Sequence, residues 1–108
     1  MNRDEIVEIF EVDSFFFNNE CYSEIHISLA HINFDKSGNK RNDFKIEKVI
    51  EMFIEEIDGK IIEPDGHKSN FVFYVHTFFA KNGKKYKVAF NTEDKKVHIR
   101  IITLYRKR

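Results

Sequence analysis

The stretch from Asn70 to Tyr105 constrains the fold of this chain more than any other. It contains three runs rich in β-branched and aromatic residues, separated by the short polar segments K-N-G-K and T-E-D-K. The Asn82-Gly83 pair is typical of a hairpin turn, because a type I′ turn needs positive φ at both central residues. The pattern therefore predicts a three-stranded antiparallel meander over about residues 70–105.

The two turns also predict which side chains share a face of this meander. A two-residue turn at 82–83 pairs Phe79 with Tyr86, and a turn tip at 93–94 fixes the second pairing in the same way. One face is then apolar and is predicted to be the core face, with Phe73, Val75, Phe79, Tyr86, Val88, Phe90, Val97, Ile99 and Ile101. The other face is mixed and is predicted to be open, with Tyr74, His76, Phe78, Lys85, Lys87, Ala89, Asn91, His98, Arg100, Ile102 and Leu104. A slip of one residue in either turn exchanges the two faces of a strand.

Length and charge favour one domain with two unlike halves. At 108 residues the chain can form a single domain, 1–108, with its own hydrophobic core. The net charge is zero, but residues 1–65 hold 16 acidic and seven basic side chains, whereas residues 66–108 hold two acidic and eleven basic ones. Either the two halves attract each other, or the basic half binds a polyanion while the acidic half faces elsewhere.

Several kinds of site and location have no support in the sequence. The single cysteine, Cys21, cannot form an internal disulfide. No apolar segment of signal-peptide form follows Met1, and no run reaches transmembrane length, so we expect a cytoplasmic protein with no membrane partner. The H-x-x-x-H, C-x-x-C, P-loop and G-x-S-x-G motifs are absent, so we expect neither a metal ion nor a cofactor.

The N-terminal third gives weaker signals. Residues 3–12 fit neither the helical nor the strand period cleanly, and their frequent Glu slightly favours a helix. The segment Phe15–Phe17 is interpreted either as a hydrophobic plug under the sheet or as an apolar surface for a partner. Residues 22–34 alternate between apolar and polar side chains and predict a strand, which a loop at 35–40 follows.

The clearest helix lies at about residues 43–58. Its apolar side chains recur at the spacing of one buried stripe, at Ile46, Val49, Ile50, Phe53, Ile54 and Ile57. Gly59 follows where a left-handed glycine commonly ends a helix, and residues 60–63 predict a short strand. The helix and the N-terminal segment, packed on one face of an antiparallel sheet, make a two-layer α+β domain whose other face is open.

Two segments resemble known bacterial families. The ending I-R-I-I-T-L-Y-R, Ile99 to Arg106, resembles the closing strand of the RelE/ParE-like toxin superfamily, which is grouped with barnase- and colicin-type ribonucleases. The segments D-F-K-I-E-K-V-I and G-K-I-I-E, within Asp43–Glu63, are similar to a toxin-like bacterial domain family of unknown function. The resemblance covers about residues 42–108. It implies a helix followed by a meander, with Tyr105 and Arg106 at positions where these proteins keep functional residues.

The mixed face offers groups suited to RNA cleavage. Metal-independent cleavage needs a base, an acid and cations that hold the phosphate, and histidine titrates near neutral pH. On the outer strands of the meander, two histidine backbones would lie roughly 10 Å apart across the strand spacing. The candidate proton-transferring residues are His76, His98 and Tyr105, and the candidate phosphate-binding residues are Lys85, Lys87, Arg100 and Arg106. Such residues are also common on half-exposed sheet faces without any function.

These residues and the resemblance predict a toxin-like protein. It would cleave RNA without a metal ion and be neutralised by an antitoxin-like protein partner. The alternative, from another class, is a non-catalytic binding protein, such as an antitoxin, an immunity protein or a phage-encoded inhibitor, whose acidic half binds a basic protein.

Overall fold

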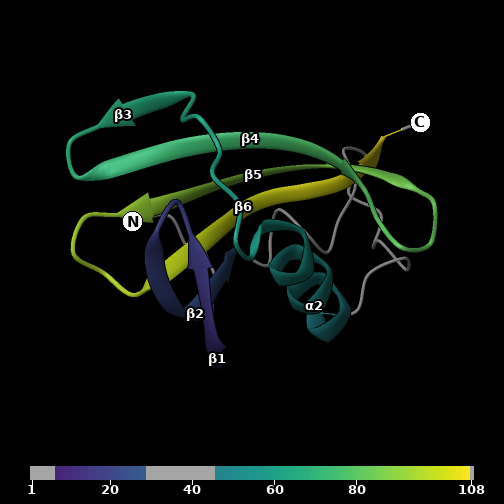
Figure 1. Ribbon diagram of the computed structural model, residues 1–108, viewed down its shortest axis with the longest axis horizontal. Helices are drawn as coiled ribbons and strands as arrows, with labels where there is room; N and C mark the ends of the chain where they lie inside the picture. Colours follow the sequence, from purple (N-terminus) through teal and green to yellow (C-terminus); the bar gives the residue numbers. More distant parts are fainter. Residues whose placement is uncertain (1–6, 29–45, 108) are drawn as a thin grey trace.

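The computed structural model describes residues 7–28 and 46–107. Over these residues the fold is mixed α+β, as predicted, with one helix and a six-stranded sheet (Figure 1). The strands are β1 (Val7–Phe17), β2 (Glu20–Ser28), β3 (Gly66–Lys68), β4 (Phe71–Phe79), β5 (Lys85–Glu93) and β6 (His98–Lys107), and the helix is α2 (Ile46–Ile57). We call the sheet face that packs on α2 the helix face, and the opposite one the outer face.

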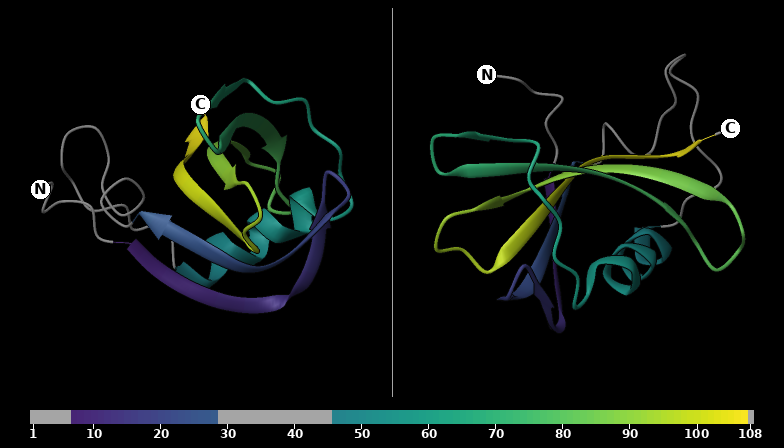
Figure 2. Two further views of the ribbon diagram at one scale, coloured as in Figure 1. Left: turned by 90° about the vertical axis from the view of Figure 1, so that its left-hand side faces the viewer. Right: turned by 45° about the horizontal axis from the view of Figure 1, so that its top comes forward.

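The order of the strands in the sheet is β1-β2-β6-β5-β4-β3. Strands β4, β5 and β6 form an antiparallel meander, and β1 and β2 form a hairpin. The hairpin curves beneath the meander and joins it through a parallel pairing of β2 with β6 (Figure 2). The expectation of a wholly antiparallel sheet was therefore wrong at this pairing, because β2 lies along the free edge of β6 and runs in the same direction as β6.

The N-terminal segment is a strand, so the slight preference for a helix at 3–12 was wrong for its described part. Helix propensity is a weak preference that tertiary pairing overrides, and here Phe10 pairs with Ile25 across the hairpin. Asn18 and Asn19 turn the chain with φ of 51° and 66°, as a two-residue hairpin turn requires. Residues 29–34, with the end of the predicted strand, and the predicted loop at 35–40 lie outside the described residues.

The short strand predicted at 60–63 is absent. Lys60 makes only an isolated bridge to Phe17, and the backbone N–H of Ile62 donates to Oδ1 of Asn18 at 2.7 Å. Because this N–H is bonded to a side chain, it is not available for a strand ladder. The edge strand forms instead as β3, which pairs with the start of β4.

The first turn of the meander is longer than predicted. Phe79 pairs with Lys85 and not with Tyr86, and the loop spans residues 80–84. The side chain of Asn82 favours this loop, because its Oδ1 accepts from the backbone N–H of Lys84 at 2.9 Å. The shift of one residue exchanges the faces of β4, so the predicted face assignment was wrong for every residue of that strand.

The second turn of the meander also gives a strand pairing other than the predicted one, but with less effect on which side chains face the core. Phe90 pairs with Ile101 instead of Val97, and an even shift leaves Ile99 and Ile101 on their predicted core face. The prediction was wrong for Val97, which precedes β6 and is 52% exposed. A register change opposite Ala89 and Phe90 then adds one residue to β6. This bulge turns Leu104 into the core, where it is fully buried, although it was predicted on the open face.

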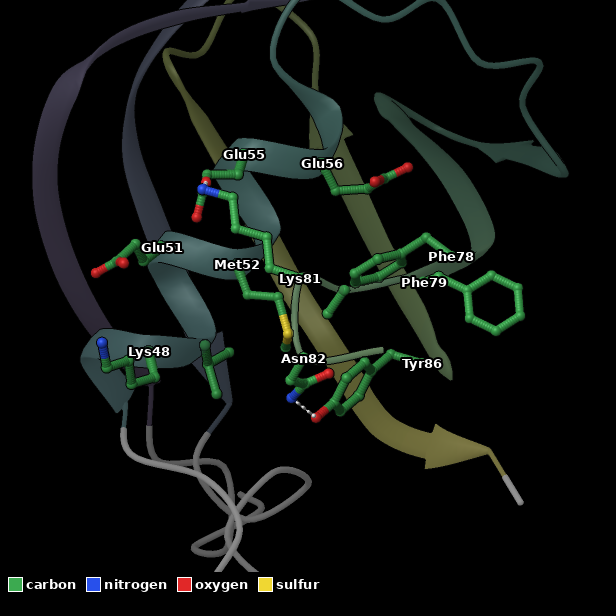
Figure 3. Close-up of a pocket in the computed structure, with 12 residues that line it drawn as sticks. Lys48, Glu51, Met52, Glu55, Glu56, Phe78, Phe79, Lys81, Asn82 and Tyr86 are labelled. Atoms are coloured by element: carbon green, nitrogen blue, oxygen red, sulfur yellow. Dashed lines mark hydrogen bonds and ion pairs between the residues drawn. The ribbon is translucent and has the colours of Figure 1, made fainter. Parts of the chain in front are cut away.

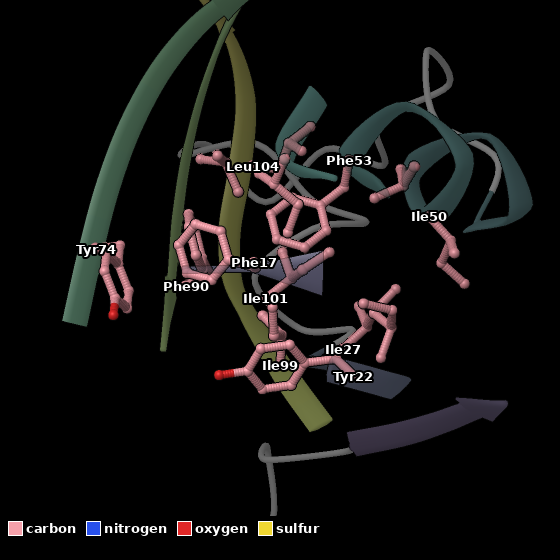
Figure 4. Close-up of a cluster of buried hydrophobic side chains, with 14 of the residues drawn as sticks. Phe17, Tyr22, Ile27, Ile50, Phe53, Tyr74, Phe90, Ile99, Ile101 and Leu104 are labelled. Atoms are coloured by element: carbon pink, nitrogen blue, oxygen red, sulfur yellow. The ribbon is translucent and has the colours of Figure 1, made fainter. Parts of the chain in front are cut away.

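The core lies between α2 and the helix face (Figure 4). Phe90 lies at its centre, with ring contacts of 5.0 Å to Phe53 and 5.4 Å to Phe17. Phe15 and Phe17 are 2% and 0% exposed, which confirms the plug interpretation for these two, whereas Phe16 is 55% exposed. The predicted helix stripe is also present, because Val49, Ile50, Phe53 and Ile57 of α2 are buried.

Helix α2 ends at Ile57, and Gly59 beyond it has a φ of 79° in the left-handed region, as the sequence predicts. The N–H of Gly59 donates to the carbonyl of Phe16 at 2.6 Å, which ties the helix end to the hairpin. Residues 43–45 of the predicted helix are outside the described part of the chain. Within residues 7–28 and 46–107, no helix has the length and apolar character needed to cross a membrane.

Candidate functional site

Five of the seven residues predicted for the site lie on the outer face. Strand alternation and the observed pairings place His98, Arg100, Lys85, Lys87 and Tyr105 there. His76 pairs with Val88 and Arg106 pairs with Tyr86, so both belong to the helix face. The sheet therefore separates His76 and Arg106 from the other five residues.

His76 belongs to an ion cluster on the helix face. Its Nε2 lies 2.7 Å from Oε2 of Glu56, and Nζ of Lys60 lies 2.9 Å from the same oxygen. Burial opposes the ionisation of Glu56, but the hydrogen bonds from His76 and Lys60 outweigh it and hold the pKa of this carboxyl below its usual value. The prediction that His76 and His98 share one face was wrong, because the one-residue shift in β4 turned His76 toward α2.

His98 and Tyr105 share the outer face but not one site. They lie near opposite ends of the exposed part of β6, about 20 Å apart at roughly 3.3 Å per residue. One scissile phosphate cannot contact both side chains. The three residues predicted to move protons therefore occupy three separate places.

The structure instead brings His98 together with His26 of β2. The two imidazoles stack in parallel, with ring centroids 3.9 Å apart and an angle of 5° between the planes. Nε2 of His26 lies 3.1 Å from Oε1 of Glu24, and Nε2 of His98 lies 3.8 Å from Oε1 of Glu93. Burial and the neighbouring His26 lower the pKa of His98, against the opposing effect of Glu93 and Glu24.

Sequence reasoning assigned no role to His26. The parallel pairing of β2 with β6 places Glu24 opposite His98 and His26 opposite Arg100. No local pattern signals this pairing, since it joins strands from the two ends of the chain. An alternating strand with a glutamate and a histidine on its polar face is the only signal in the sequence.

Arg100 borders the histidine pair. Its guanidinium donates from Nε at 3.3 Å and from Nη2 at 3.0 Å to Oγ of Ser28. On its other side it pairs with Asn91, which is 7% exposed. Among the described residues, the Oδ1 atom of Asn91 is buried without a hydrogen-bond partner. A cation and an unsatisfied acceptor thus lie beside the two imidazoles.

The other end of the outer face is basic. Lys87 pairs with Tyr105, and Lys85 pairs with Lys107 across the same two strands. Nζ of Lys85 lies 5.8 Å from the ring centroid of Phe79, which is 68% exposed. Cations and aromatic rings therefore alternate toward the end of the meander, and the histidine and glutamate cluster lies at the opposite end.

A cavity of about 570 Å³ opens elsewhere, between α2 and the loop that joins β4 to β5 (Figure 3). Met52 and Phe78 line it, and Lys81 closes its rim through an ion pair with Glu55. The amide of Asn82 donates to the Tyr86 hydroxyl at 3.1 Å. None of the seven predicted site residues lines this cavity, and it holds no imidazole. Lys48, Glu51 and Glu56 also line it, so the cavity is of mixed polarity.

Comparison of the chain with protein-family models, with curated proteins and with solved structures finds no match.

Proposed function

We propose that the protein acts on RNA through the outer face of its sheet. The observation that carries this proposal is the gathering of Lys85, Lys87, Arg100 and Tyr105 on one face of β5 and β6. Lysine and arginine bind backbone phosphates, and the half-buried Tyr105 offers a ring on which an unpaired base stacks. A single strand running along β6 would pass from the basic end to the histidine pair.

We assign the cleavage chemistry to His26 and His98, in place of the three separated residues. One neutral imidazole takes the proton of a 2′-hydroxyl, and the 2′ oxygen attacks the adjacent phosphorus. The other imidazole, in its protonated form, gives its proton to the 5′ oxygen as the P–O5′ bond breaks. The products are a 2′,3′-cyclic phosphate and a free 5′-hydroxyl, and Arg100 holds the charge that develops on the phosphate.

The biological role that we propose is that of a toxin neutralised by a protein partner. This role rests on the resemblance of Ile99–Arg106 to the closing strand of RelE/ParE-like toxins, together with the basic outer face. A neutralising partner would act most directly by covering the outer face. RNA and an antitoxin-like protein would then compete for the same cations.

The decisive experiment is tightly controlled expression in a bacterial host, with growth and total RNA followed together. The wild-type chain should arrest growth and fragment RNA, and His26→Ala and His98→Ala should each abolish both effects. His67→Ala is the matched control, since His67 is exposed on β3. Arrest and cleavage that persist in both variants contradict the assignment of the chemistry. Circular dichroism and thermal unfolding of each variant separate lost activity from lost folding.

A second function, binding of a basic protein, is favoured by one observation. Glu47, Glu51 and Glu55 are exposed along α2 and form an acidic stripe away from the outer face. Normal growth with intact RNA would favour this second function, in which the protein is a non-catalytic antitoxin, immunity protein or inhibitor. Replacing the three glutamates by glutamine should then weaken capture of the basic partner, while Lys85→Gln should not.

A further inference from the structure

We propose that Glu24, His26 and His98 form a binding site for a divalent transition-metal ion, with Zn²⁺ as the best-suited ion. The three side chains offer one carboxylate oxygen and two imidazole nitrogens, which all lie within 4.8 Å of one another. In a tetrahedral zinc site with bonds of roughly 2.0–2.1 Å, the ligand atoms stand about 3.4 Å apart. Oε1 of Glu24 and Nε2 of His26 are already 3.1 Å apart. The two stacked imidazoles must in addition tilt away from their parallel arrangement, so that both nitrogen lone pairs point at one ion.

A candidate fourth ligand, Glu93, lies beside this set, although it is not one of the three residues whose ligand atoms all lie within 4.8 Å of one another. Oε1 of Glu93 lies 3.8 Å from Nε2 of His98, on the side of β5. With Glu93 bound, the site closes with two nitrogens and two oxygens, and without it a water molecule completes the coordination. The four residues come from three adjacent strands, β2, β6 and β5, which hold their backbones in fixed register.

The donor set favours a transition metal over a hard cation. Imidazole nitrogen suits Zn²⁺ and its first-row neighbours, whereas Mg²⁺ and Ca²⁺ prefer oxygen ligands throughout. All four side chains are partly shielded from water, with 15% to 33% of each exposed. A cation between them offsets the two carboxylate charges and uses both imidazoles in their neutral form.

The metal site has a consequence that rests on the proposed function. An imidazole whose nitrogen is bound to a metal ion cannot exchange a proton through that nitrogen. Metal binding and the acid–base pair therefore exclude each other, so Zn²⁺ should inhibit RNA cleavage and a chelator should restore it. Zn²⁺ binding at this site would thus act as a reversible inhibitor of RNA cleavage.

The test is calorimetric titration of Zn²⁺ into the full chain. The chain carries no affinity tag, and bound metal is first removed with a chelator that is then itself removed. The wild type should bind a single ion. His26→Gln, His98→Gln and Glu24→Gln should each weaken binding at least about tenfold, because loss of an outer-shell partner alone costs that much. His67→Gln and His76→Gln are the controls and should bind as the wild type does. Absence of saturable binding, or binding unchanged in the His26 and His98 variants, overturns the proposal.

Two further measurements keep the outcomes separate. Co²⁺ bound in place of Zn²⁺ should give strong visible absorption for a tetrahedral site, and this absorption should be lost in His98→Gln. RNA cleavage is followed in chelator and again after Zn²⁺ is added. If RNA is cleaved in chelator and added Zn²⁺ does not change the rate, the proposed inhibition by Zn²⁺ is wrong. If no RNA is cleaved in chelator, the proposed function is wrong, and the calorimetric result still decides whether the metal site exists.

Discussion

The ring of Phe90 contacts aromatic side chains from three other elements of the core. It is fully buried, and its ring meets Phe53 from α2, Phe17 from β1 and Tyr74 from β4 (Figure 4). The first two contacts are edge-on, at 77° and 66°, and the third is stacked at 13°. Aromatic pairs in these arrangements add about 0.5–1.5 kcal/mol each beyond the area they bury.

Phe90→Leu should lower the free energy of unfolding by about 2–4 kcal/mol, through the loss of three ring contacts and a small cavity. Urea denaturation followed by circular dichroism measures this change. Phe79→Leu is the matched control on the neighbouring strand, and it should change stability by less than about 0.5 kcal/mol because its ring is exposed. Equal effects of the two substitutions would contradict this view of the core.

Glu56 should make the stability of the protein depend on pH. The pKa of this carboxyl is held below its ordinary value of 4.5, so its ionised form stabilises the fold above that pH. The stabilisation is lost as pH falls through the lower, folded-state pKa. Glu56→Gln should therefore cost on the order of 1 kcal/mol at neutral pH and close to nothing well below pH 4.5.

Urea titrations of the wild type and Glu56→Gln at several pH values measure this difference. Glu63→Gln supplies the control, since it removes the same charge at an exposed position away from His76 and Lys60. A gap between wild type and Glu56→Gln that stays constant down to acid pH would show that the contacts with His76 and Lys60 carry no charge-dependent stabilisation.

Among the elements, the turn between β1 and β2 does more than reverse the chain. Its first residue, Asn18, bonds through its side-chain amide to both backbone groups of Ile62 and to the hydroxyl of Tyr74. Its backbone N–H also donates to the carbonyl of Lys60. The second residue, Asn19, has the same left-handed backbone, but its side chain makes no hydrogen bond of this kind to any residue within 7–28 and 46–107. The turn thus fixes the hairpin to the segment that follows α2.

Replacing each asparagine by glycine separates backbone from side chain. Asn19→Gly should be within about 0.5 kcal/mol of the wild type, because glycine accepts positive φ readily. Asn18→Gly keeps the turn but removes three hydrogen bonds of roughly 0.5–1.5 kcal/mol each, so it should cost about 2–3 kcal/mol. Thermal and urea unfolding measure both. If the two variants are equally stable, the side chain of Asn18 does not hold the hairpin in place.

At the scale of the whole molecule, the two oppositely charged halves of the sequence lie side by side in one sheet. The hairpin from the acidic half lies beside β6 from the basic half. One end of the outer face consequently carries Lys85, Lys87 and Lys107, while the other carries Glu24 and Glu93. A polyanion would therefore bind the outer face from its basic end.

The salt dependence of the proposed RNA binding tests this arrangement. For single strands, the slope of log K against log salt is about −0.7 for each phosphate neutralised. The double substitution of Lys85 and Lys87 by glutamine should therefore reduce the size of the slope by about 1.4. Anisotropy of a labelled single-stranded RNA over a salt series measures it. The same double substitution at Lys48 and Lys60, on the helix side, should leave the slope unchanged, and equal losses would argue against binding by the outer face.

The sequence determined the elements that short-range patterns specify. The apolar stripe of α2, the left-handed Gly59 beyond its end and the strands of the meander follow from spacing and turn chemistry within a few residues. The faces of β5, and of β6 up to its bulge, also agree with the alternation of their side chains. These features need no knowledge of distant parts of the chain, because neighbouring residues alone produce the helical and strand periods.

Only the tertiary structure decided which histidines meet. The loop at 80–84, within which Oδ1 of Asn82 accepts from the N–H of Lys84, is longer than a two-residue turn and places His76 on the helix face. The parallel pairing of β2 with β6 then brought His26 to His98. Side chains alternate along a strand, so one additional residue in a loop moves every side chain of one of the two paired strands to the opposite face. Which strands pair with each other depends on the packing of the whole domain. The candidate site depends on both choices, and neither is encoded within a short stretch of sequence.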